Sequence, residues 1–159
     1  MKTNYLFPYR FKRIGWFLFV PGIILGIIFL MDQSNFKFLN VTVFSLAHHT
    51  LFGGSTEFFT FFKTNIFDEI IGLLLLIGAL LIAFSKEKSE DEFISKIRLE
   101  SLVWATYINY SILILTIIFI YDMAFFWVLV FNMFTILIFF IIRFNWVIYK
   151  SKNQIQDEE

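Results

Sequence analysis

The chain is divided into long apolar blocks separated by shorter polar stretches, with little mixing of the two. The apolar blocks cover residues 14–31, 66–84, 101–120 and 124–149. About 20 consecutive apolar residues in a helix cross the roughly 30 Å hydrocarbon core of a bilayer. The pattern therefore predicts an all-α integral membrane protein, in which a single domain contains four transmembrane helices.

The longest charged stretch, residues 85–100, separates the second and third apolar blocks. Ser89 and Glu92 have the spacing of a capping box, which predicts a helix that starts at Glu90 and continues into the third span. Its first turns would form a stalk about 15 Å long outside the membrane. One side of this stalk is apolar and would either rest on the membrane or another loop, or dock a partner; it consists of Phe93, Ile94 and Ile97.

The largest segment outside the spans, residues 32–65, is expected to be partly extended. Residues 36–45 are rich in β-branched and aromatic side chains, which favours a strand. Gly53 and Gly54 indicate a turn, and residues 57–62 would return as a second strand. The alternative for residues 57–62 is a helix lying in the membrane interface.

The distribution of Lys and Arg predicts the orientation of the chain. Of 13 such residues, 11 lie near the two termini or in residues 85–100, and only Lys37 and Lys63 lie in residues 32–65. Cytoplasmic segments carry the excess of Lys and Arg. We therefore expect both termini and residues 85–100 to be cytoplasmic, residues 32–65 to be external, and the membrane to be a bacterial inner (plasma) membrane. The polar tail, residues 150–159, is expected to be disordered.

Two contacts are predicted between the third and fourth spans, which a very short turn at residues 121–123 would join. Glu100 precedes Tyr121 by 21 residues and Arg143 follows Asp122 by 21, so the two side chains should lie at one depth and form an ion pair. Deeper in the membrane, a polar layer would either hydrogen-bond across helices or line a substrate site. It consists of Asn109, Asn132, Thr106 and Thr135.

These two contacts compete for one helix interface. Glu100 and Asn109 are nine residues apart, which places them on opposite faces of one helix.

In the first span, Gly22 and Gly26 are four residues apart and allow another helix to approach closely. That helix would be either a second span of the same chain or a second copy of the protein.

Candidate chemistry is sparse. His48 and His49, with nearby acidic residues, are candidate zinc ligands on the outer side. Adjacent residues on a strand point in opposite directions, so the alternative is a pair of loop histidines that titrate. The absence of cysteine excludes disulfides, Cys-ligated metals and thiol catalysis within this sequence, and the formal net charge of zero gives no basic surface for nucleic acid. No motif indicates a cofactor.

Three functions remain open at this stage. The first is a non-enzymatic membrane protein that acts by interaction, as a subunit, assembly factor or sensor, through the stalk. The second is an oligomeric small transporter or channel with a polar layer at Asn109 and Asn132. The third is a metal-dependent membrane enzyme that uses His48 and His49 on the outer face. The sequence does not identify a substrate, and the expected partners are the lipid bilayer and either another protein or further copies of the chain.

Overall fold

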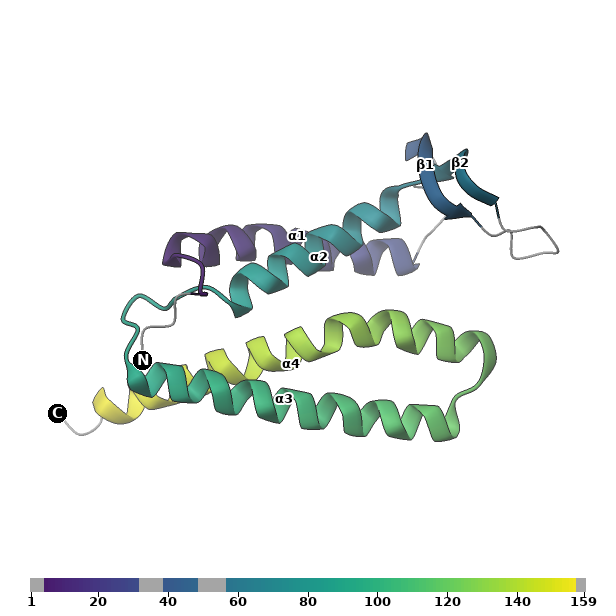
Figure 1. Ribbon diagram of the computed structural model, residues 1–159. Coiled ribbons are helices and arrows are strands. Elements are labelled where there is room, and N and C mark those ends of the chain that lie inside the picture. Colours follow the sequence, from purple (N-terminus) through teal and green to yellow (C-terminus); the bar gives the residue numbers. More distant parts are fainter. Residues whose placement is uncertain (1–4, 32–38, 49–56, 157–159) are drawn as a thin grey trace.

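The computed structural model describes residues 5–31, 39–48 and 57–156. Its elements follow one another as α1 (Tyr9–Met31), β1 (Asn40–His48), β2 (Glu57–Asn65), α2 (Phe67–Ala83), α3 (Glu92–Phe119) and α4 (Asp122–Gln156). The helices form two antiparallel pairs, α1 with α2 and α3 with α4, and α2 also packs on α4 (Figure 1). The two strands lie beyond one end of the first pair, opposite the end where α1 begins and α4 finishes.

Three helices in the described part of the chain, α1, α3 and α4, are long and apolar enough to cross a membrane. Only 11% of the apolar window of α3, and the same share for α4, is buried inside the protein. Apolar surfaces of that extent are rarely left exposed to water by soluble proteins. The three helices therefore indicate an integral membrane protein. The fourth helix, α2, is also apolar but has only 17 residues, against 23, 28 and 35 in α1, α3 and α4.

The α1–α2 pair is held close by glycines. A Cβ added at Gly15 would lie 2.9 Å from the carbonyl oxygen of Gly78, and a Cβ added at Gly78 would lie 2.8 Å from the backbone nitrogen of Phe19. Neither distance is compatible with a side chain, so the two backbones touch. Of the two glycines singled out in the sequence, Gly22 lies tightly against Leu75, whereas Gly26 is in ordinary contact with Ile71. The helix that approaches them is thus the chain's own α2.

The hydrophobic core lies toward the end of the molecule where α3 begins. All four helices contribute to it, α1 through a single residue, and it consists of Phe19, Ala79, Ile82, Ala83, Ile97, Ala105, Phe140, Ile141, Phe144 and Ile148. Phe140 and Phe144 stack with their rings 5.5 Å apart. Toward the turn between α3 and α4, these two helices present mostly exposed apolar side chains.

The two strands, β1 and β2, form the hairpin predicted as one of two alternatives. They pair antiparallel from Asn40 opposite Asn65 to His48 opposite Glu57. The alternative of an interfacial helix for residues 57–62 is wrong, because this segment pairs along its length with β1. Asn65 ends the second strand, and its Oδ1 accepts a hydrogen bond of 2.9 Å from the backbone nitrogen of Phe67, where α2 begins. Gly53 and Gly54 lie outside the described residues.

Two predicted helix ends need correction. α3 begins at Glu92 rather than Glu90, because the carboxylate of Asp91 accepts a 2.8 Å hydrogen bond from the backbone nitrogen of Ile94 and caps the helix. A capping aspartate replaces the predicted capping box of Ser89 and Glu92. At the other end of the chain, α4 continues to Gln156, so most of the tail expected to be disordered is helical.

Candidate functional site

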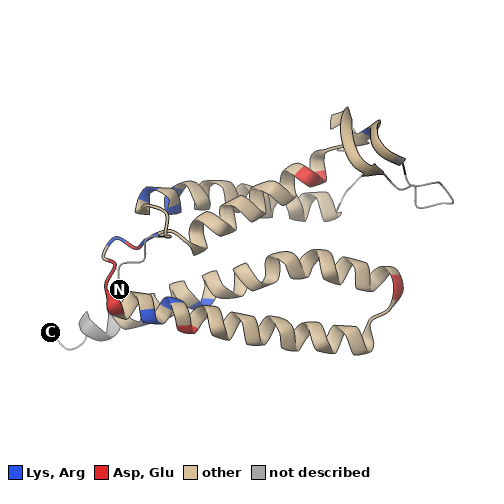
Figure 2. Ribbon diagram, viewed as in Figure 1, with Lys and Arg blue, Asp and Glu red and all other residues tan. Residues whose placement is uncertain are grey.

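Charged side chains gather at one end of the molecule, where α1 and α3 begin and α4 finishes (Figure 2). The middle parts of the four helices carry no charged residue in this view. Both features follow from the cost of placing a charge in a bilayer, which confines Lys, Arg, Asp and Glu to helix ends.

At the charged end, the side chain of Arg98 contacts several groups from separate segments. Its Nη2 lies 3.1 Å from both carboxylate oxygens of Glu90. Its Nη1 donates to two backbone oxygens at the end of α2, at 3.0 Å from that of Ala83 and 3.2 Å from that of Ser85. The last carbonyls of a helix lack partners within the helix and attract a cation. Arg98 therefore ties the end of α2 to the start of α3.

The same guanidinium reaches the fourth helix. It lies 4.7 Å from the ring centre of Phe144, a cation–π geometry. The side chains of Arg98 and Glu90 are only 12% and 18% exposed, so their charges are largely withdrawn from solvent. One guanidinium nitrogen, Nε, is buried and has no hydrogen-bond partner among the described residues.

A second ion pair, between Lys12 and Glu87, connects α1 to this cluster. The Lys12 ammonium also donates to the side-chain oxygen of Asn145 on α4, at 3.2 Å. Next to it, the backbone of Phe7 pairs with the loop after α2: its nitrogen donates to the oxygen of Phe84 at 2.9 Å, and its oxygen accepts from the nitrogen of Lys86 at 2.8 Å. All four helices are thus joined at this end.

We call this set the inner cluster: Lys12, Glu87, Glu90, Arg98 and Asn145. Its two cations and two carboxylates pair with each other and leave no excess charge. Such an arrangement fixes the relative positions of helix ends, and its chemistry does not require a substrate. Sequence reasoning missed it, because the charges come from three separate segments and only the folded chain brings them together.

The predicted polar layer forms one contact between helices. Asn109 and Asn132 bond to each other in both directions, with Nδ2 of Asn132 3.2 Å from Oδ1 of Asn109 and the reverse pair at 3.5 Å. Asn109 is only 3% exposed. The hydroxyls of Thr106 and Thr135 instead donate to carbonyls of their own helices, those of Leu102 and Phe131. The layer is therefore a single satisfied amide pair and does not extend into a polar path through the described helices.

The predicted ion pair between Glu100 and Arg143 does not form, and the two residues are joined through the backbone of Glu100 instead. Nη1 of Arg143 donates to the main-chain oxygen of Glu100 at 2.7 Å. The Glu100 carboxylate lies instead on the exposed side of α3, 4.0 Å from the ammonium of Lys96. The Arg143 contact and the Asn109–Asn132 amide pair therefore form together. Arg143 reaches the backbone carbonyl of Glu100, near the helix axis, while the Glu100 side chain points elsewhere.

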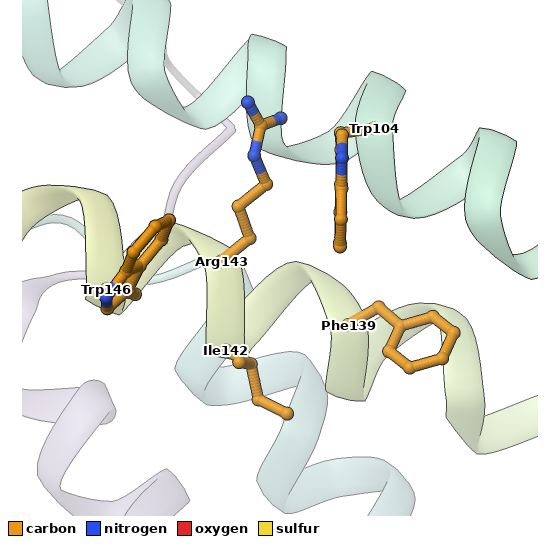
Figure 3. Close-up of a pocket in the computed structure, with 5 residues that line it drawn as sticks. All are labelled: Trp104, Phe139, Ile142, Arg143 and Trp146. Atoms are coloured by element: carbon orange, nitrogen blue, oxygen red, sulfur yellow. The ribbon is translucent and has the colours of Figure 1, made fainter.

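Arg143 also lines an open pocket on the outer surface of the α3–α4 pair. The pocket has a volume of about 310 Å³ and is lined by Trp104, Phe139, Ile142, Arg143 and Trp146 (Figure 3). The guanidinium lies 5.2 Å from the ring centre of Trp104. Figure 3 shows the Arg143 side chain extending from α4 toward α3, beside the edge-on ring of Trp104.

The predicted docking residues on α3 differ in burial. Ile97 is 5% exposed and belongs to the hydrophobic core, and Ile94 packs against that core. Ile97 cannot contact a partner unless the helices separate, and Ile94 is half-buried. Phe93, which is 54% exposed, is the member of the trio that remains accessible. The segment is therefore no free stalk, since Arg98 and Ile97 hold it against α2 and α4.

The side chains of the candidate zinc ligands, His48 and His49, lie outside the part of the chain that the structure describes. Residues 49–56, which include His49, lie outside the described part of the chain, and His48 is described only in its backbone pairing with Glu57. Within the described residues, no group of three or more His, Cys, Asp or Glu side chains is placed to hold a metal ion.

Comparison of the chain with protein-family models, with curated proteins and with solved structures finds no match.

Proposed function

We propose that this chain is a non-enzymatic polytopic membrane protein that acts by binding another protein at the charged end of its helices. In this proposal α2 is a fourth membrane span and, with the other three, forms one transmembrane domain. Both chain ends face the cytoplasm of a bacterial cell with the hairpin outside, and the membrane is the inner membrane. The uneven distribution of Lys and Arg supports this orientation.

One observation carries the proposed interaction: Phe93 is an exposed aromatic residue on a rigidly held helix start. The capping bond of Asp91 and the contacts of Arg98 fix the first turns of α3, and Phe93 projects from them. An aromatic side chain that is already ordered loses little conformational entropy on binding, and aromatic residues are enriched among interface hot spots.

The two other functions have weaker support. Transport would need a polar path, and Asn109 and Asn132 satisfy each other instead of offering free amides. A metal-dependent reaction would need ligands that converge, and no such group is present among the side chains that the structure describes.

The test is site-specific photo-crosslinking in intact membranes. A photo-reactive phenylalanine analogue is placed at position 93 and, as a matched control, at position 99. Leu99 lies on another face of the same helix and is 64% exposed. We expect a discrete adduct with one other protein from position 93 and none from position 99.

The Phe93→Ser variant provides the second readout. We expect it to reduce co-purification of the crosslinked partner at least severalfold, as expected when a hot-spot aromatic is truncated. Absence of an adduct at position 93, or adducts only with a second copy of the chain, would overturn the proposed binding of another protein.

A further inference from the structure

The pocket around Arg143 has the composition of a site for a lipid headgroup. Arg143 follows Asp122, the first residue of α4, by 21 residues, which is about 31 Å along a helix. This distance is close to the thickness of the hydrocarbon core. The guanidinium therefore lies at the level where acyl chains give way to headgroups, on the side of the chain ends.

The hydrogen-bonding capacity of Arg143 is only partly used. Nη1 donates to the Glu100 backbone oxygen. The other guanidinium nitrogens have no hydrogen-bond partner among the residues that the structure describes. A guanidinium at the edge of the hydrocarbon region needs acceptors, and its planar fork suits the two oxygens of a phosphate.

The walls of the pocket suit the rest of a lipid. Trp104, Phe139, Ile142 and Trp146 present apolar surface, and Trp146 is 62% exposed on the outer face. Tryptophan is enriched at this depth in membrane proteins because its ring is apolar and its N–H is polar. The glycerol backbone and first acyl carbons of a phospholipid could lie against these side chains while the phosphate meets Arg143.

The local charge favours an anionic lipid. The Lys150 ammonium lies 5.9 Å from the ring centre of Trp146 and adds a second cation beside the pocket. On the facing helix, the carboxylate of Glu100 lies 4.0 Å from the ammonium of Lys96, which compensates its charge. The pocket therefore has two cations beside it, Arg143 and Lys150, whereas the charge of the Glu100 carboxylate is compensated by Lys96.

We propose that the pocket formed by Trp104, Phe139, Ile142, Arg143 and Trp146 binds the phosphate of an anionic phospholipid in the leaflet on the side of the chain ends. This site lies on the α3–α4 surface, and its occupation does not depend on the partner proposed at Phe93. The lipid would anchor the α3–α4 pair at a defined depth in that leaflet.

The experiment is native mass spectrometry of the full-length protein in detergent. The protein is titrated with phosphatidylglycerol or with phosphatidylcholine of the same acyl chains. We expect roughly 5- to 30-fold tighter binding of phosphatidylglycerol, the size expected of one or two cations near a headgroup. In the Arg143→Gln variant this preference should be lost.

The matched control is Arg13→Gln. Arg13 also lies at the charged end, is exposed, and has its guanidinium 5.7 Å from the ring centre of Tyr9, but it is on α1 and outside the pocket. This variant should keep the lipid preference. If Arg143→Gln does not fold, Trp146→Leu and Lys150→Gln carry the test, because both side chains are exposed, and each should weaken phosphatidylglycerol binding severalfold.

Three results would overturn the proposal. The first is equal binding of the two lipids by the wild type. The second is an equal loss of preference in Arg143→Gln and Arg13→Gln, which would indicate a general effect of charge. The third is displacement of phosphatidylglycerol by inorganic phosphate, which would indicate a site for a free anion and not for a lipid.

Discussion

At the scale of single residues, Arg98 shows how a charge is retained at the end of a membrane bundle. Its guanidinium bonds to a carboxylate and to the last carbonyls of α2, and it lies over an aromatic ring of α4. A largely buried ion pair adds little stability compared with an apolar replacement of both partners, but removal of one partner leaves the other charge uncompensated. Loss of Arg98 alone should therefore cost more stability than replacement of both Arg98 and Glu90.

Replacement Arg98→Gln should lower the free energy of unfolding by roughly 2–4 kcal/mol, because Glu90 and the α2 carbonyls lose their partner in a poorly solvated site. The measurement is reversible unfolding in mixed detergent, followed by tryptophan fluorescence. The double variant Arg98→Gln/Glu90→Gln should recover part of the loss.

The control for this prediction is Glu100→Gln. The Glu100 carboxylate is 56% exposed and lies 4.0 Å from Lys96. An exposed pair of this kind contributes less than about 0.5 kcal/mol. If Arg98→Gln and Glu100→Gln have the same small effect, the inner cluster does not stabilise the helix ends.

At the scale of elements, the two helix pairs are held together by different means. The backbones of α1 and α2 touch at Gly15 and Gly78. α3 and α4 are linked by the Asn109–Asn132 amide pair and by Arg143. Within a membrane the hydrophobic effect does not drive helix association, so close packing and polar contacts determine which helices pair.

The Gly15→Ala variant should destabilise the protein by about 1–3 kcal/mol, because its Cβ would overlap the α2 backbone and force the helices apart. Gly72→Ala is the matched control, since a Cβ there meets nothing within 4 Å. It should be neutral or stabilising by up to about 1 kcal/mol, given the low helix propensity of glycine. Thermal unfolding of both variants in one detergent provides the comparison, and equal midpoints would contradict the predicted backbone contact.

The amide pair gives a prediction that also tests the transport alternative. Asn109→Leu should cost about 0.6–1.7 kcal/mol, the range measured for such bonds between membrane helices. A double-variant cycle with Asn132→Leu should give a coupling energy of about the same size. If the variants were fully stable in reconstituted vesicles and yet abolished a measurable solute flux, the amide pair would belong to a transport site.

At the scale of the whole molecule, the charged end and the hairpin lie at opposite ends of the helices (Figure 2). This separation is what a chain crossing a bilayer requires, and it makes the orientation directly testable. Because the chain has no cysteine, a single introduced cysteine reports on its own position.

In intact bacterial cells, Thr42→Cys on β1 should react with a membrane-impermeant maleimide, and Ser89→Cys should react only after the cells are opened. Both positions are exposed in the structure. The reverse pattern would invert the proposed orientation. Labelling of both positions from outside would contradict the four-span proposal, in which one span, α2, lies between Thr42 and Ser89 and places them on opposite sides of the membrane.

Several features of this protein follow directly from its sequence. The lengths of the apolar blocks indicated membrane helices. The β-branched and aromatic residues in segments 36–45 and 57–62 predicted the hairpin that β1 and β2 form. The meeting of Asn109 with Asn132, and of residue 100 with residue 143, followed from counting along a helical hairpin with a short turn. These are local constraints, because bilayer thickness and backbone hydrogen bonding act on contiguous segments.

Only the tertiary structure decided which side chains of the charged end are paired and which are exposed. Lys12 and Glu87 are 75 residues apart, and nothing in either segment identifies the other. Ile97 is buried because α3 packs against α2 and α4, so an apolar side that looked free in the sequence is mostly covered, with Phe93 left accessible. The physical reason is that partner choice at helix ends depends on how separate helices meet in space, whereas periodicity describes one helix at a time.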